Sequence, residues 1–202
     1  MKERFYDRTA ARLDQEGLGA RRERLVAALE GEVLEVGAGT GMNLPRYRRA
    51  GRLVALEPDR AYLRRLRARA EAAAVPVEVV RATAEAIPLP DASFDHVVTT
   101  IALCAVADLD ASLSEIRRVL RPGGTLEFIE HVRGEGSLAG WQDRLAPLHR
   151  LLVDGCNPNR ETAAAIERAG LRLTTLEHFT MPAPALVRPA VQGSALRQPD
   201  IP

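Results

Sequence analysis

The sequence predicts a doubly wound α/β fold, in which helices cover both faces of a mostly parallel β-sheet. Short runs of β-branched residues alternate with longer helix-prone segments along most of the chain. The first run, 32–36, leads directly into a glycine-rich turn at 37–41. The next run, 52–57, ends on the acidic residue Glu57. Because ligands bind such sheets at the carboxyl ends of the strands, both features indicate a binding site at that edge.

Hydrophobic periodicity and the positions of glycine and proline predict the remaining elements. We expect one or two helices in the charged segment 2–29, and a helix from about Met42 whose first turn contains Pro45. The predicted strands are 32–36, 52–57, 77–81, 94–100, 125–129, 171–179 and 186 to about 196. The further predicted helices are 59–73, 110–120 and 160–169.

The same pattern predicts the domain organisation. Residues 1–30 form an N-terminal helical segment, and residues 31–196 form a single domain. The pattern is looser at about 131–159, which we interpret as a cover over the substrate. The last residues, 197–202, are expected to form a frayed tail.

The composition excludes several classes of protein. The chain has 202 residues, of which 46% are hydrophobic and 27% charged, as is usual for a soluble globular domain. The net charge of +1 gives no electrostatic argument for a nucleic-acid partner, so we expect none. Cys104 and Cys156 are too widely spaced to suggest a metal site, and they suit a reducing compartment. With neither a signal-peptide core nor a membrane-spanning run in view, we expect a cytoplasmic protein of unknown oligomeric state.

The turn after the first strand contains three alternate glycines, Gly37, Gly39 and Gly41. Glycines let the backbone approach a ligand closely, and the carboxylate of Glu57 can accept two hydrogen bonds from a ribose diol. A dinucleotide fingerprint needs a further glycine where this chain has Met42. Glu35 lies two residues before the turn, where a carboxylate repels a diphosphate but suits a ligand with an ammonium and a sulfonium group. The pattern therefore indicates a cationic nucleoside cofactor.

The string from Glu35 to Gly41 resembles motif I of the class I S-adenosylmethionine-dependent methyltransferases. The resemblance implies a Rossmann-like, seven-stranded sheet with one antiparallel late strand, and S-adenosylmethionine as the cofactor. It also implies an adenine-binding loop after the third strand, formed by Thr83, Ala84 and Glu85; many relatives have Asp where this chain has Thr83. Thr100, at the end of the fourth strand, corresponds to a position near the methionine part of the cofactor.

The second half of the chain resembles a narrower group. The segments 128–132, 141–142, 152–157 and 186–189 are similar to the methyltransferase-like 7 group, which includes animal thiol S-methyltransferases. The animal members have an apolar N-terminal anchor, whereas the segment 2–29 of this chain is charged. A peripheral membrane contact through this N-terminal helix remains an expectation.

Methyl transfer from a sulfonium requires mainly that the donor and the acceptor are aligned and that water is excluded. His131, at the carboxyl end of the strand at 125–129, is the first candidate for a general base; a structural histidine is the alternative. His149 and Asp154 are further candidates in the substrate cover, although structural roles are the alternative for both. Trp141 and Cys156 are candidates to line the acceptor pocket, with simple packing as the alternative.

These features predict an enzyme that transfers a methyl group from S-adenosylmethionine to a small-molecule acceptor, with a thiol as the first choice. A phospholipid or quinone methyltransferase is an alternative, because such enzymes have a similar N-terminal half. A non-catalytic cofactor-binding subunit is a second alternative. An assay of methyl transfer to thiols, amines and phenols distinguishes the three.

Overall fold

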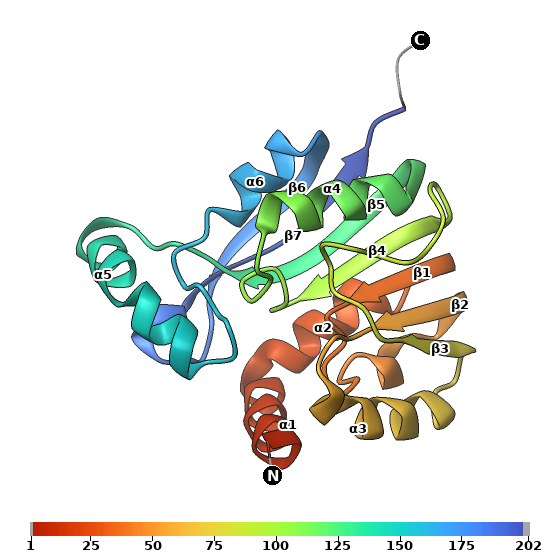
Figure 1. The fold of residues 1–202 in the computed structure, drawn as a ribbon, viewed down its shortest axis with the longest axis horizontal. Helices are drawn as coiled ribbons and strands as arrows, with labels where there is room; N and C mark the ends of the chain where they lie inside the picture. Colours follow the sequence, from red (N-terminus) through yellow and green to blue (C-terminus); the bar gives the residue numbers. More distant parts are fainter. Residues whose placement is uncertain (1, 200–202) are drawn as a thin grey trace.

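The computed structural model describes residues 2–199, and its centre is a seven-stranded sheet (Figure 1). The strands are β1 (Glu30–Val36), β2 (Arg49–Leu56), β3 (Val77–Val80), β4 (Phe94–Thr100), β5 (Leu120–His131), β6 (Leu171–Thr180) and β7 (Pro189–Arg197). Their order in the sheet is β3-β2-β1-β4-β5-β7-β6. The strands from β3 to β5 are parallel, whereas β7 is antiparallel to both β5 and β6. The predicted fold class is confirmed.

In residues 2–199, six α-helices connect and cover the strands: α1 (Lys2–Leu13), α2 (Gly19–Val26), α3 (Arg60–Glu71), α4 (Leu109–Val119), α5 (Gly136–Leu152) and α6 (Thr162–Arg168). Three shorter helical turns are η1 (Asp14–Leu18), η2 (Leu44–Arg46) and η3 (Ala185–Val187). The carboxylates of Asp59 and Asp108 cap α3 and α4 by accepting hydrogen bonds from backbone N–H groups of the first turn.

Successive residues of the central strands face opposite sides of the sheet, which therefore has a hydrophobic core on each face. In β1, Leu34 belongs to the core that includes residues of α4 and α6, whereas Val33 belongs to the core that includes residues of α2 and α3. This arrangement explains why the buried strands read as nearly continuous apolar runs.

One helix prediction was wrong, and one helix was not predicted. The helix expected from Met42 is only the short turn η2, because the chain becomes extended at Tyr47 and enters β2 soon afterwards. The loose segment at 131–159 contains the 17-residue helix α5. Its sequence pattern is weak because Pro147 lies inside the helix and because only the side chains of Ala139, Gln142 and Ala146 are buried.

The two ends of the described chain also bear on the predictions. The N-terminal segment forms α1, η1 and α2, as expected. β7 continues to Arg197, whose guanidinium donates a hydrogen bond to the carbonyl of Arg117, whereas 200–202 of the predicted tail lie outside the described residues. Within the described part of the chain, no helix is both long and apolar enough to cross a membrane.

Candidate active site

A cavity of about 1480 Å³ lies at the carboxyl edge of the parallel strands. Its lining comes from α1, the turn after β1, the ends of β2 and β5, and the loops after β3 and β4. The segments around 149–156 and 180–188 complete the wall. Ordinary ligand pockets have volumes of about 300–1,000 Å³, so this cavity has room for a cofactor and a small acceptor together.

At one end of the cavity, Glu57 is held in a fixed orientation by the backbone. The Gly39 N–H donates to Oε2 of Glu57 and the Asp59 N–H donates to Oε1, each at 2.8 Å. Glu57 is 5% exposed and lines the cavity. An ionised carboxylate can accept several hydrogen bonds, so a carboxylate held in this orientation suits a ribose diol.

The turn after β1 provides a cradle that only glycine allows. Gly37 and Gly39 have φ values of 70° and 57°, in the left-handed region that other residues rarely adopt. A Cβ at Gly37 would lie 2.6 Å from the Cβ of Ala102, and one at Gly39 would lie 3.0 Å from the Tyr6 hydroxyl. This bare backbone beside the Glu57 carboxylate fits the nucleoside part of S-adenosylmethionine.

Three of the predicted cofactor residues do not appear among the described residues that line the cavity. Gly41 packs instead, because a Cβ there would meet the side chains of Leu44 and Leu66. Glu35 and Thr100 lie beneath the turn, where the Asn43 amide donates to Oε1 of Glu35 at 3.1 Å and to the Thr100 hydroxyl at 3.0 Å. The structure therefore assigns these residues to support of the turn, not to its ligand-facing surface.

Glu35 is the most perturbed carboxyl group in this support. Burial raises its pKa to about 7, against the opposing effects of the Tyr47 hydroxyl, the Arg22 guanidinium and the Asn43 amide. Its Oε2 is buried without a hydrogen-bond partner among the described residues. A carboxyl group in this environment titrates close to neutral pH.

The predicted adenine loop lies at the wall of the cavity. Thr83, Ala84 and Glu85 all line it. The Glu85 carboxylate accepts hydrogen bonds from the backbone N–H groups of Ala107 and Asp108, at 2.7 and 3.3 Å. Burial opposes ionisation of Glu85, but hydrogen bonds from backbone N–H groups outweigh it and lower the pKa. Glu85 thus ties the adenine loop to the start of α4.

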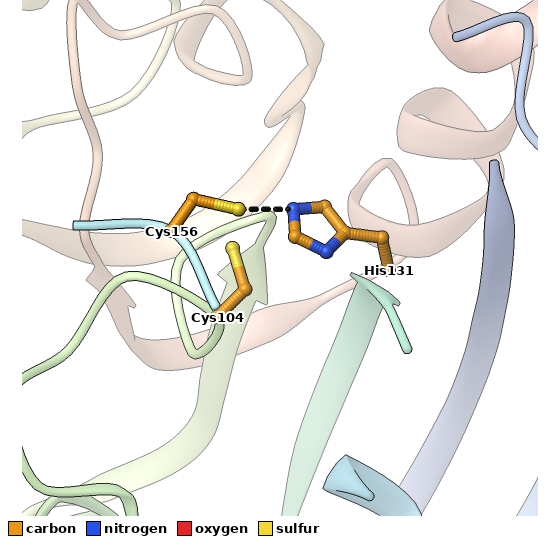
Figure 2. Close-up of side chains that lie close together, drawn as sticks. All are labelled: Cys104, His131 and Cys156. Atoms are coloured by element: carbon orange, nitrogen blue, oxygen red, sulfur yellow. Dashed lines mark hydrogen bonds between the residues drawn. The ribbon is translucent and has the colours of Figure 1, made fainter. Parts of the chain in front are cut away.

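At the other end of the cavity, His131, Cys156 and Cys104 lie together (Figure 2). The Nε2 atom of His131 is 3.2 Å from Sγ of Cys156. Their exposed fractions are 4% for His131, 6% for Cys156 and 1% for Cys104. The pKa of Cys156 is lowered to about 5, mainly by a hydrogen bond from the Cys104 thiol. Burial raises this pKa, and the interaction with His131 lowers it further.

Of the other residues predicted in the substrate cover, His149 and Asp154 line the cavity, whereas Trp141 does not appear among the described lining residues. His149 interacts with the backbone carbonyl of Cys156, and Asp154 accepts a hydrogen bond from the Tyr62 hydroxyl at 2.9 Å. Trp141 is 55% exposed on α5. The expectation that it lines the acceptor pocket is wrong, because the helix turns its ring outward, near the Arg144 guanidinium.

Several residues of the site were not predicted from the sequence. Tyr6 reaches the glycine turn from α1, and no local pattern indicates this long-range contact. Glu130 is fully buried beside His131 and accepts hydrogen bonds from the backbone of Ala102 and Leu103, both at 3.1 Å. Cys104 follows β4, so the rule that functional residues gather at the carboxyl ends of strands would have found it.

The sheet order, the antiparallel β7 and the glycine cradle beside Glu57 define a class I methyltransferase. Comparisons with known proteins agree. Residues 34–128 match the model of a methyltransferase domain. The human thiol S-methyltransferase TMT1A is 39% identical over 171 residues, which cover 82% of this chain and 70% of the relative.

Two further comparisons extend this result. The phosphatidylethanolamine N-methyltransferase of Cereibacter sphaeroides is 34% identical over 130 residues, or 63% of this chain and 64% of the relative. A crystal structure of an S-adenosylmethionine-dependent methyltransferase from Thermotoga maritima covers 97% of each chain with a TM-score of 0.70, and at 21% identity it supports the fold alone. The chain belongs to the S-adenosylmethionine-dependent methyltransferase family that includes human TMT1A.

Proposed function

We propose that this methyltransferase acts on a small thiol. The observation that supports the proposal most is the position of the buried His131 and Cys156 pair, which lies in the same cavity as the Glu57 and glycine cradle. The cavity is large enough for both substrates, and most of its wall is apolar. The relationship to enzymes named as thiol S-methyltransferases points to the same acceptor class.

One set of residues would bind the cofactor, and another would orient the acceptor thiol. Glu57 and the backbone of the turn at Gly37 and Gly39 would hold the nucleoside, with Thr83, Ala84 and Glu85 at the adenine end. S-adenosylmethionine supplies a methyl group that its positively charged sulfur already activates. The side chains around the acceptor end would orient the thiol in line with this methyl group and exclude water.

Activation of the acceptor requires loss of the thiol proton, because the thiolate is the nucleophile. His131 lies at the acceptor end, but its Nε2 already interacts with Cys156, and its Nδ1 is buried without a partner in residues 2–199. A general base at His131 therefore requires separation of this pair or transfer of a proton through it. His149 and Asp154, which also line the cavity, remain secondary candidates.

A panel of acceptors with matched carbon skeletons tests the proposal. The panel contains an apolar thiol, the corresponding alcohol and amine, a phenol, a quinol and phosphatidylethanolamine. We expect turnover with the thiol and at least 100-fold lower kcat/KM with every other acceptor. Preference for the quinol or the phospholipid would support the alternative enzyme classes instead. Cofactor binding without turnover of any acceptor would support a non-catalytic subunit.

A peripheral membrane contact and a cytoplasmic location also remain proposals. In α1, Glu3 and Asp7 form ion pairs with arginines of α3, so this part of the predicted membrane helix packs on the protein. Exposed apolar side chains gather on α5 instead, at Trp141, Leu148, Leu151 and Leu152. Co-sedimentation with phospholipid vesicles, compared between the wild type and a Leu151→Glu variant, would show whether α5 makes such a contact.

A further inference from the structure

We propose that Cys104, His131 and Cys156 form a three-ligand site for a zinc ion, with its fourth coordination position open to the acceptor end of the cavity. The role of this ion in activating an acceptor thiol rests on the proposed function. Binding of the metal ion itself does not depend on the proposed function. The sequence spacing argued against a metal site, but the fold brings the three side chains together (Figure 2).

The distances suit a tetrahedral zinc ion. One ligand atom from each of the three side chains lies within 4.8 Å of the others. Zinc binds sulfur at about 2.3 Å and nitrogen at about 2.0–2.1 Å, so tetrahedral ligands are about 3.5–3.8 Å apart. The 3.2 Å separation between Nε2 of His131 and Sγ of Cys156 is close to this range. Small side-chain rotations would therefore bring all three atoms into position.

The backbone holds the two cysteine loops against each other. The N–H of Asn157 donates to the carbonyl of Cys104 at 2.8 Å, and the Asn157 side-chain amide donates to the same oxygen at 3.3 Å. On the opposite side, the Glu130 carboxylate accepts a hydrogen bond from the Cys104 N–H at 3.4 Å. His131 follows Glu130 at the end of β5, so the backbone of all three ligands is held in place by a strand or by hydrogen bonds.

The donor set and the charge balance favour zinc. Two thiolates and one imidazole form a set that zinc accepts, and three protein ligands with one open position are typical of catalytic zinc. The ion would neutralise both thiolates in a buried site.

All three ligands also line the cavity, so an acceptor thiol can reach the open position. On binding, the thiol would lose its proton to solvent and coordinate zinc as a thiolate. The acceptor sulfur then forms a bond to the methyl carbon, while the bond between that carbon and the donor sulfur breaks and its electron pair stays on the donor sulfur. The products are a neutral thioether and S-adenosylhomocysteine, and the thioether leaves because it is a weak zinc ligand.

Titration of the reduced, metal-free protein with Zn²⁺ alone tests the site without donor or acceptor. We expect one equivalent of tightly bound zinc, measured by competition with a chromophoric chelator. Co²⁺ should occupy the same site and give sulfur-to-cobalt charge-transfer absorption. Cys104→Ser, Cys156→Ser and His131→Asn should each weaken zinc binding by more than about 100-fold, beyond the loss typical of outer-shell changes. His178→Asn, on the exposed surface of β6, is the matched control and should bind zinc normally.

Circular dichroism and binding of S-adenosylhomocysteine would establish that each variant is folded. The inference would be overturned if the reduced wild type takes up no zinc, or if Cys104→Ser and Cys156→Ser bind zinc as tightly as the wild type does. Thiol methylation that survives complete removal of metal would overturn the role of the ion in catalysis, although the proposed function would then stand. Conversely, stoichiometric zinc bound by these ligands in a protein that methylates no thiol would support the site and contradict the proposed function.

Discussion

Replacement of Glu57 by alanine tests the cofactor end of the cavity. The carboxylate is placed to accept hydrogen bonds from both ribose hydroxyls, and its position is held by the N–H groups of Gly39 and Asp59. Charge-assisted hydrogen bonds contribute about 1.5–3 kcal/mol each. Allowing for incomplete additivity, Glu57→Ala should weaken cofactor binding by about 2–4 kcal/mol, or roughly 30- to 1,000-fold.

Isothermal titration calorimetry with S-adenosylmethionine measures this loss directly. Because the variant leaves two backbone N–H groups without their acceptor, its folding must be checked by circular dichroism and thermal unfolding. Glu57→Gln keeps the shape of the side chain and should lose less affinity than Glu57→Ala. Glu71→Ala, at the exposed end of α3, is the control and should bind normally. Unchanged affinity in a folded Glu57→Ala protein would refute the reasoning.

The remaining predictions concern the turn, the cofactor class, the chemistry and the pH dependence of stability. Gly39→Val should abolish binding of S-adenosylhomocysteine with a smaller loss of stability, and normal binding would show that the turn has been misread. Because Met42 replaces the dinucleotide glycine, NAD and FAD should raise the melting temperature less than S-adenosylhomocysteine at equal concentration; the reverse order would exclude the cofactor assignment. His131→Ala should lower turnover by about 10²–10⁴-fold with little change in cofactor affinity, and near-normal turnover would remove His131 from the active site. The pKa of Glu35 is raised to about 7 by burial, so the folded protein binds an extra proton between about pH 4.5 and 7 and loses stability as pH rises through this window. Urea unfolding of Glu35→Gln should show a pH dependence that is weaker by up to about 3 kcal/mol, and identical profiles would contradict the burial argument.

The sequence was most informative where periodicity and position along a strand agree. All seven strands were predicted, because the buried runs are short, apolar and separated by helical segments or turn residues. The helix α5 was missed because its buried stripe is narrow and includes the polar Gln142, whose amide is satisfied by backbone carbonyls at 132, 158 and 186. Such tertiary hydrogen bonds leave no local pattern in the sequence.

The same distinction applies to the site. Residues at or just beyond the carboxyl ends of strands, such as Gly37, Gly39 and His131, were found because parallel strands bring these ends together. The role of Trp141 was inferred without knowledge of its helical phase, and the structure turns its side chain away from the cavity. The cluster around Cys104 could not be predicted from spacing, because loops that are distant in the sequence meet only in the folded protein.

The central claim is that methyl groups pass to thiol sulfur in the cavity between Glu57 and His131. The most direct measurement is mass spectrometry of the products formed from S-adenosylmethionine with a deuterated methyl group and an apolar thiol. We predict a deuterated thioether and S-adenosylhomocysteine in equal amounts, with the rate greatly reduced in Glu57→Ala at subsaturating cofactor. A deuterated amine, quinol or phospholipid from a mixed-acceptor reaction, with no thioether, would contradict the claim.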